Sequence, residues 1–153
     1  LIIPGGESTT LSKLITNQGL LDTISTFVNE KPVFGTCAGL ILLANNSNDR
    51  QIVSFNSLDI EVERNGWGRQ INSFKKKIDI QIDVEKYNYD GIFIRAPKIK
   101  NYNKTVKVLS YLNESPVMIK SNMILGTTFH PELTDDLRIH AFFINMVKEY
   151  NLC

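Results

Sequence analysis

A cysteine stands in the middle of the short string Gly35-Thr36-Cys37-Ala38-Gly39. Apolar runs precede and follow it, Pro32-Val33-Phe34 and Leu40 to Ala44, as is typical of a buried strand that leads into a helix. The form G-x-C-x-G is the thiol counterpart of the G-x-S-x-G nucleophile elbow, in which glycines permit a sharp turn. The unpaired N–H groups and the dipole at a helix start favour the nucleophilic thiolate. The pattern indicates a nucleophilic cysteine, and a buried structural cysteine is the alternative.

A nucleophilic thiol needs a base, and the chain has only two histidines, His130 and His140. His130 follows an apolar strand and precedes Pro131, in a position where α/β folds place reactive groups. Glu132 lies two residues further on, and residues i and i+2 of an extended chain face the same way, so its carboxylate can orient the imidazole. His140 falls inside a C-terminal helical pattern and is interpreted as a packing or surface residue. The sequence therefore predicts a Cys-His-Glu triad.

Acyl transfer from an amide also requires donors for the oxyanion. The N–H of Ala38, directly after the cysteine, is the first candidate. The second is the turn Gly5-Gly6, which carries no side chains that block approach. A plain connection between a strand and a helix is the alternative interpretation of this turn.

Composition excludes several classes of function. The chain has 153 residues and a formal net charge of +1, with both signs interspersed, which argues against nucleic acid or an anionic membrane as a partner. Its length fits one domain, which we expect to span residues 1–153. Two cysteines do not make a disulfide framework, so a reducing, cytoplasmic setting is expected. The chain opens on Leu1-Ile2-Ile3, which resembles a strand already under way, and we expect a strand-helix unit to be missing before it.

The first third of the chain predicts strands separated by helices. A strand over Leu1 to Ile3 leads into Pro4-Gly5-Gly6, and Ser and Thr residues then act as capping candidates for a helix. Gly19 is expected to end this helix before a second one begins. The cysteine turn follows, and Asn45 to Asp49 are expected to form a polar surface loop.

From Gln51 to about Asn122 the apolar residues recur with a period of two, which indicates strands. The expected strands contain, in order, Ile60 to Glu63, Ile78 to Val84, Gly91 to Ile94, Val106 to Leu109, Pro116 to Ile119 and Met123 to Gly126. Val106 to Leu109 and Pro116 to Ile119 are expected to pair as a hairpin. A final helix is expected to have one apolar side, formed by Leu137, Ala141, Ile144 and Val147. Together these elements predict a mixed-sheet α/β domain.

Three strings in this order, PGGEST, GTCAGL and FHPEL, resemble the triad-type class I glutamine amidotransferases. Three more, VERNGWGRQINSF, FIRAP and HPELTDD, are similar to the glutaminase subunits of pyridoxal 5′-phosphate synthase, and the resemblance covers nearly the entire chain. It implies a three-layer flavodoxin-like domain with a mixed, mostly parallel central sheet. It also implies hydrolysis of glutamine to glutamate and ammonia, which passes to a (β/α)8-barrel synthase subunit that makes pyridoxal phosphate.

Carried over residue by residue, the resemblance makes Cys37 the nucleophile, His130 the base and Glu132 its orienting carboxylate. The glutamine-binding residues that it implies are Gly5, Gly6, Glu7, Arg64, Ile94 and Arg95. Gly6 and Ala38 are the expected oxyanion donors. A substrate with an α-carboxylate and an α-ammonium needs fixed charges, which suits the arginines, although surface arginines are the alternative without the resemblance. Trp67 stands where the family usually has Phe or Tyr, which is interpreted as a tolerated exchange.

The resemblance implies no metal and no organic cofactor, since pyridoxal phosphate is the product of the complex. Two other interpretations stay open at this point. One is a glutaminase subunit that serves a different synthase, against which FIRAP and RNGWGRQ argue. The other is a catalytically inactive docking subunit, against which the intact Cys37, His130 and Glu132 argue.

Overall fold

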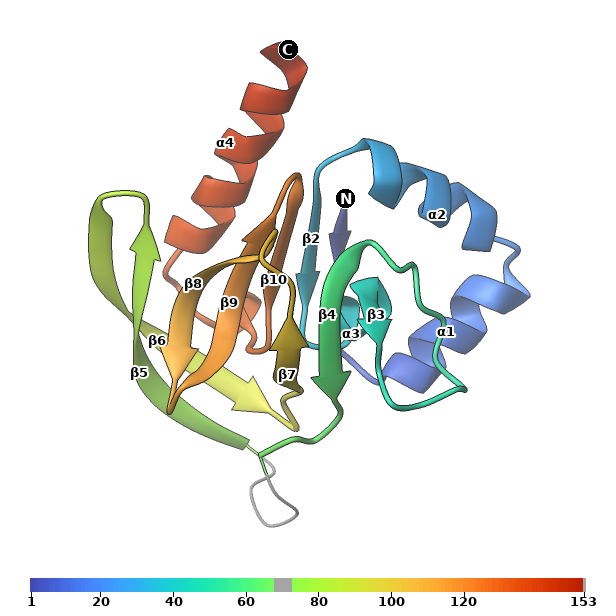
Figure 1. The fold of residues 1–153 in the computed structure, drawn as a ribbon, viewed down its shortest axis with the longest axis horizontal. Helices are drawn as coiled ribbons and strands as arrows, with labels where there is room; N and C mark the ends of the chain where they lie inside the picture. The colour runs from blue at the N-terminus through green and yellow to red at the C-terminus, as the bar shows by residue number, and fades with distance from the viewer. Residues whose placement is uncertain (68–72, 153) are drawn as a thin grey trace.

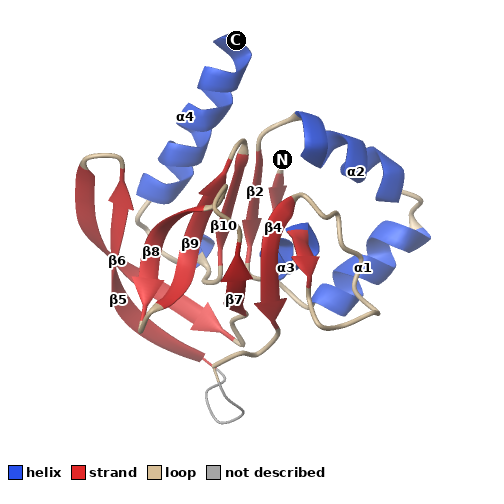
Figure 2. Cartoon of the chain, viewed as in Figure 1, coloured by secondary structure: helices blue, strands red, loops and turns tan. Residues whose placement is uncertain are grey.

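A seven-stranded sheet with helices on both faces forms the body of the computed structural model, which describes residues 1–67 and 73–152 (Figures 1 and 2). The helices are α1 (Ser8–Asn17), α2 (Leu21–Glu30), α3 (Ala38–Leu43) and α4 (Arg138–Leu152), with a 3-10 turn, η1, at Pro131–Leu133. The strands are β1 (Ile2–Ile3), β2 (Val33–Thr36), β3 (Ala44–Asn46), β4 (Leu58–Glu63), β5 (Ser73–Ile82), β6 (Glu85–Ile94), β7 (Lys98–Tyr102), β8 (Lys107–Leu112), β9 (Ser115–Ser121) and β10 (Ile124–Thr127).

The large sheet has the order β1-β2-β10-β9-β8-β5-β6, and a smaller sheet has the order β3-β4-β7. Strand β2 pairs in parallel with β1 and with β10, and the other four pairs of the large sheet are antiparallel. Short hairpins join β5 to β6 and β8 to β9, and a hairpin can join only antiparallel strands. The mixed α/β fold is confirmed, and the parallel section of the described sheet is smaller than expected.

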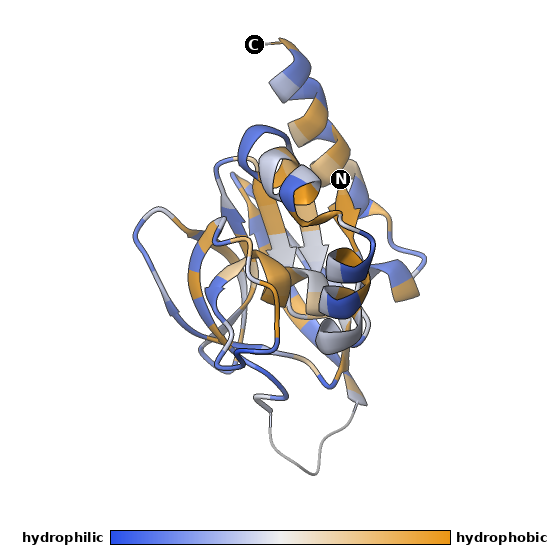
Figure 3. Ribbon diagram, turned by 90° about the vertical axis from the view of Figure 1, so that its right-hand side faces the viewer, coloured by the Kyte–Doolittle hydropathy of each residue, from blue (hydrophilic) through white to orange (hydrophobic). Residues whose placement is uncertain are grey.

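The large sheet separates two apolar cores, because neighbouring residues of a strand face opposite sides. In β2, Val33 packs into the core under α1, α2 and α3, whereas Phe34 packs into the core under α4. The small sheet contributes to the first core through buried residues such as Ile60 and Val62. Figure 3 shows that the central strands carry few hydrophilic residues. The result is three layers, with the large sheet in the middle and the ends of β2 and β10 side by side.

Several predicted elements differ in extent from those observed. Strand β5 ends at Ile82, two residues before the predicted end. Val84 continues the alternating apolar pattern of the sequence, but it lies in the hairpin turn and is 96% exposed. Strand β6 is longer than the predicted Gly91 to Ile94, and β7 was not predicted. The expected polar loop over Asn45 to Asp49 begins inside β3. The predicted hairpin between β8 and β9 is confirmed.

The buried side of α4 differs from the predicted one, although Val147, one of the predicted residues, packs against the core under α4. Its buried residues are Ile139, Phe143 and Met146, whereas Ile144 is 53% exposed. Leu137, also assigned to the buried side, is exposed and precedes the helix. Both sets recur at helical spacing, so the sequence pattern alone did not distinguish them.

The first helix begins differently from the prediction. Glu7, not a Ser or Thr, is the N-cap of α1, and its carboxylate accepts hydrogen bonds from the backbone N–H groups of Thr9 and Thr10. Gly19 follows the helix with a φ of +65°, as its predicted role as a helix end requires. None of the helices among residues 1–67 and 73–152 has the length and hydropathy needed to span a bilayer.

Candidate active site

Cys37 occupies a strained turn between β2 and α3, as the G-x-C-x-G pattern predicted. Its φ is 47° and its ψ is −101°, values that a non-glycine residue rarely adopts, and its N–H donates to the carbonyl of Thr127 at 2.8 Å. The glycines on each side allow close packing. A Cβ on Gly39 would lie 2.8 Å from the carbonyl carbon of Ile3, and one on Gly35 would lie 2.7 Å from Leu43. The turn therefore presents the thiol at the ends of β1, β2 and β10.

The second reactive group, His130, follows β10 and directly precedes η1. Its backbone N–H donates to the carbonyl of Ile92 at 2.8 Å, which ties this segment to β6. Its Nδ1 lies 2.8 Å from Oε1 of Glu132, so the predicted contact between the two side chains is present. The expected extended backbone between them is wrong, because Pro131–Leu133 forms a 3-10 turn. The turn itself brings the carboxylate back to the imidazole.

The electrostatics of this pair favour two charged partners. The pKa of His130 is raised to about 10, chiefly by the neighbouring Cys37 side chain and next by Glu132. Burial is the largest single effect on Glu132 and opposes its ionisation, but the hydrogen bonds and the charge of His130, together with a backbone N–H and Thr36, outweigh it and hold the pKa of that carboxyl below its usual value. Nε2 of His130 is buried and makes no hydrogen bond among the described residues. The Cys37 thiol donates instead to the carbonyl of Ile94 at 3.8 Å. The closeness of thiol and imidazole therefore raises the pKa of His130 although the geometry holds no formed hydrogen bond between them.

Two residues support this pair in ways that the sequence did not reveal. The hydroxyl of Thr36, inside the elbow string, donates to Oε1 of Glu132 at 3.4 Å. Gly5 lies against the imidazole: a Cβ there would lie 2.7 Å from Nδ1 of His130, and closer still to Cε1. It would also lie 3.4 Å from Cβ of Cys37. Gly5 therefore makes room for the histidine, whereas the sequence suggested room for a substrate.

A second polar cluster joins three segments beside this centre. The Arg64 guanidinium donates to Oε1 of Glu7 at 3.2 Å and, through its other terminal nitrogen, to Oδ2 of Asp49. Hydrogen bonds from Thr10 and Thr9 lower the pKa of Glu7 to about 2, so Glu7 is ionised at neutral pH. Glu7 and Arg64 were predicted site residues, and the structure brings them into contact. Asp49 was missed, because it carried no motif.

The remaining predicted residues lie around the same turn or apart from it. Ala38 is the first residue of α3, so its N–H has no intrahelical acceptor, and Gly6 has a φ of +144° with open space beside it. Ile94 and Arg95 are exposed at the end of β6, and Arg95 has a φ of 44°. His140 lies apart on α4, edge-on to the ring of Phe34, with centroids 5.9 Å apart. The part of the predicted motif at positions 68–72 lies outside the described residues.

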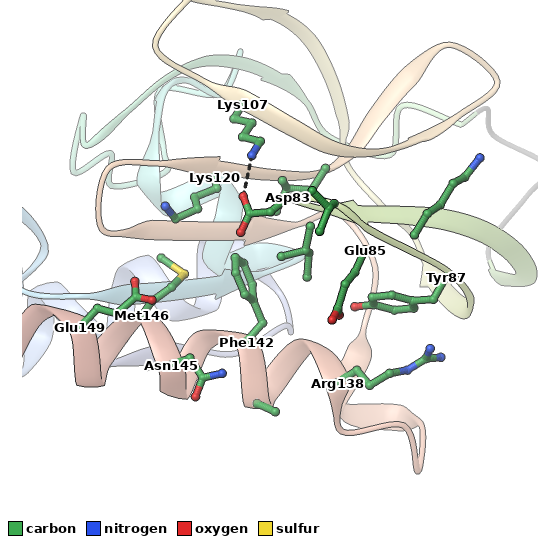
Figure 4. A pocket seen from close by; sticks show the side chains of 15 residues that line it. Asp83, Glu85, Tyr87, Lys107, Lys120, Arg138, Phe142, Asn145, Met146 and Glu149 are labelled. Atoms are coloured by element: carbon green, nitrogen blue, oxygen red, sulfur yellow. Dashed lines mark hydrogen bonds and ion pairs between the residues drawn. The ribbon is translucent and has the colours of Figure 1, made fainter.

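A cavity of about 770 Å³ lies between the β5–β6 hairpin and α4 (Figure 4). Its lining combines apolar side chains such as Phe142 with charged ones, including the ion pair of Lys107 with Asp83 at 3.1 Å. None of the candidate site residues lines it. The reacting groups are therefore held at a different part of the molecule, at the ends of the parallel strands.

Residues 1–149 match the model of the SNO glutamine amidotransferase family. The chain is 47% identical over 155 residues to the pyridoxal 5′-phosphate synthase subunit PdxT of Nitrosopumilus maritimus, covering 97% of this chain and 75% of that protein. It is 49% identical over 147 residues to the subunit of the same name from Thermoplasma volcanium, covering 95% and 72%.

The fold also matches solved structures. A crystal structure described as a glutamine amidotransferase superposes with a TM-score of 0.86 at 38% identity, covering 97% of this chain and 78% of that one. A Thermotoga maritima glutamine amidotransferase, at 13% identity and a TM-score of 0.56, shares the fold. On its match over residues 1–149 and on these relatives, the chain belongs to the SNO glutamine amidotransferase family.

Proposed function

We propose that this chain is the glutaminase subunit of a pyridoxal 5′-phosphate synthase: it hydrolyses L-glutamine to L-glutamate and ammonia for vitamin B6 synthesis. Family membership and the names of the relatives support this function. The observation that carries the chemistry is the strained Cys37 turn beside His130, whose Nδ1 lies 2.8 Å from Glu132. A structural cysteine would need neither the strained backbone nor the ordered imidazole.

The proposed reaction has two halves. The Cys37 thiolate attacks the carbonyl carbon of the side-chain amide, and the C–N bond breaks as the His130 imidazolium gives its proton to the departing nitrogen. The product is ammonia, with a glutamyl thioester on Cys37. Neutral His130 then takes a proton from water, which attacks the thioester and releases glutamate. Glu132 keeps the imidazole oriented and stabilises its charged form.

The oxyanion that forms in each half requires N–H donors, for which we propose Ala38 and Gly6. The glutamine itself is bound by Gly5, Gly6, Glu7, Arg64, Ile94 and Arg95. Arg64 and Arg95 supply fixed positive charge for the α-carboxylate of the substrate. The raised pKa of His130 fits this scheme, since the resting imidazolium is the proton donor of the first half.

The proposal includes a partner and a setting. Ammonia that escapes into neutral water is mostly protonated and no longer nucleophilic. Glutamine hydrolysis therefore supplies reactive ammonia only when a synthase subunit is docked. We propose a (β/α)8-barrel synthase subunit as that partner, the cytoplasm as the location, and one amidotransferase domain over residues 1–153. Docking would adjust the Pro4-Gly5-Gly6 turn, where Gly6 has open space, and thereby complete the oxyanion hole.

The test is glutamine hydrolysis by the natural protein while the cognate synthase is titrated in. One oxyanion donor is worth ~10²–10³-fold in rate, so a stimulation of that order is expected. The Cys37→Ala variant with saturating synthase is the control and should release no ammonia. Full activity without synthase would contradict gating at the turn. No glutamate release in any mixture would contradict the glutaminase function and favour an inactive docking subunit.

A further inference from the structure

Arg64, the proposed carboxylate-binding residue, is held from two sides by carboxylates of different segments. One terminal nitrogen donates to Asp49 and the other donates to Glu7 at 3.2 Å. Asp49 lies between β3 and β4, whereas Glu7 caps α1. Asp49 belongs to none of the sequence motifs, and only these contacts indicate its role.

Glu7 has little capacity left for the arginine. Its two oxygens already accept from the backbone N–H and the hydroxyl of both Thr9 and Thr10, at 2.5 to 3.3 Å. An ionised carboxylate offers about four lone-pair sites, and these four donors occupy them. Arg64 donates to Oε1, an atom that already accepts from the N–H and the hydroxyl of Thr9. Asp49 is therefore the main anionic partner of the guanidinium.

Asp49 is itself fixed before any substrate arrives. Its Oδ1 accepts from the N–H of Gln51 at 2.9 Å, which leaves Oδ2 for Arg64. Its carbonyl accepts from the N–H of Ile52 at 3.2 Å, and Ile52 is buried. The next N–H, of Val53, donates at 3.0 Å to the buried hydroxyl of Ser12 on α1. The aspartate is thus anchored to the helix that Glu7 caps.

The arginine is anchored as well, by the turn that follows β4. Trp67, three residues later, donates from Nε1 to the carbonyl of Pro97 at 3.3 Å and packs edge-on against Phe74 and Phe93. Arg64 and Asp49 keep 29% and 26% of their side chains exposed. The turn that carries Arg64 is thus held by Trp67 and the guanidinium by Asp49, while part of the arginine side chain remains exposed to a ligand.

The cluster is joined to the reacting groups by a short piece of chain. Gly5 lies against His130 and Cys37, and Glu7 is only two residues further on. Two residues span at most ~7 Å, which is the scale of glutamine from its side-chain amide to its α-carboxylate. Among the described residues, the Glu7 and Asp49 contacts use two of the five N–H groups of Arg64, so the others remain for that carboxylate while Asp49 retains its own hydrogen bond.

We propose that Asp49 is a positioning residue that holds Arg64 ready for the α-carboxylate of glutamine; the inference rests on the proposed glutaminase function. Without Asp49 the long side chain has to be ordered at each binding event, which weakens binding but leaves the bond-breaking groups untouched. The hydrogen bond from Gln51 keeps the pKa of Asp49 below its usual value, so the effect is expected to be the same from pH 6 to pH 9.

The test is Asp49→Asn in the complex with the synthase. Asparagine retains an oxygen for the N–H of Gln51, so the local turn is preserved and only the anion facing Arg64 is lost. We expect KM for glutamine to rise roughly tenfold, the scale of one charge-assisted hydrogen bond, with kcat within about twofold of the parent. Asp79→Asn, which breaks the surface ion pair with Lys86 at 2.9 Å, is the matched control and should leave both constants unchanged.

A second arm asks whether Asp49 acts through Arg64. In an Arg64→Ala background, Asp49→Asn should have no further effect on KM, because its partner is already absent. A further rise of the same size in that background, or an unchanged KM in Asp49→Asn alone, would overturn the inference. A fall in kcat together with the melting temperature would also overturn it, since that indicates a merely structural role.

A third readout separates the inference from the proposed function. Calorimetric titration of glutamine into the Cys37→Ala complex measures binding without turnover, and Asp49→Asn should weaken that affinity about tenfold. Turnover by the parent with unchanged binding in the Asp49 variant overturns the inference alone. Absence of both glutamine binding and turnover overturns the inference and the proposed function together.

Discussion

Replacing Gly5 by Ala should remove most glutamine hydrolysis although Gly5 carries no reactive group. An alanine Cβ would lie 2.7 Å from Nδ1 of His130, whereas carbon atoms make optimal contacts at about 3.5–4.0 Å. Either the imidazole or the Pro4-Gly5-Gly6 turn must therefore move by about 1 Å. A displaced imidazole loses the 2.8 Å contact with Glu132, and a displaced turn moves the proposed donor Gly6.

A misplacement of 1 Å in an active site costs on the order of 10² in rate, or about 2.7 kcal/mol in activation free energy. We expect kcat of Gly5→Ala with saturating synthase to fall by that factor. Steady-state glutamate release measures it. Gly19→Ala is the control, because Gly19 has a φ of +65° and a Cβ added there meets no atom of the described residues within 4 Å, so this change lowers stability without touching the site.

Thermal unfolding of both variants separates lost folding from lost chemistry. A Gly5→Ala protein that melts like the Gly19→Ala control yet turns over slowly agrees with the close contact of Gly5 and His130. Parental kcat in Gly5→Ala would refute the reasoning, since it would mean that the imidazole position is not set by this contact.

Three further results are expected. His130→Asn should lower kcat by ~10²–10⁴-fold, whereas His140→Gln should resemble the parent because His140 packs against Phe34 on α4, apart from the reacting groups; equal losses would leave the choice of base unsupported. The pKa of His130 is about 10 in the fold against 6.5 in the unfolded chain, so its charge stabilises the fold fully below pH ~6.5 and this contribution is lost as the pH rises through about 10. Urea unfolding of parent and His130→Asn should therefore differ more at pH 6 than at pH 10.5, and a difference that grows with pH would contradict the assignment. Arg95→Ala should raise KM for glutamine while a small uncharged alkylating agent still modifies Cys37 at the parental rate; an unchanged KM would make Arg95 a surface residue.

The elbow and the histidine were predictable because each depends on local chemistry. A strained turn between a strand and a helix needs small neighbours, and the glycines around Cys37 are visible in the sequence. The parallel pairing that places Thr36 beside Thr127, and so brings the two strand ends together, is a long-range property. The family resemblance implied a mostly parallel sheet, but neither it nor the periodicity of the strands predicted this pairing.

What the sequence failed to predict is mostly long-range packing. The contact between His130 and Glu132 was expected for a wrong local reason, because a 3-10 turn replaces the extended backbone. The link of Asp49 to Arg64 joins residues fifteen positions apart through side chains alone, and neither spacing nor composition marks it. Val84 continued an apolar alternation but falls in a hairpin turn, since pattern alone does not fix where a strand ends.

The most direct test of the proposed mechanism is to identify the residue that becomes covalently modified. A chloroketone analogue of glutamine, applied to the complex with the synthase, should modify Cys37 alone by peptide mass spectrometry. Excess glutamine should slow the modification, and Cys37→Ala should neither react nor release ammonia. An adduct on Cys153 in place of Cys37, or appreciable ammonia release by Cys37→Ala, would contradict the thiol mechanism.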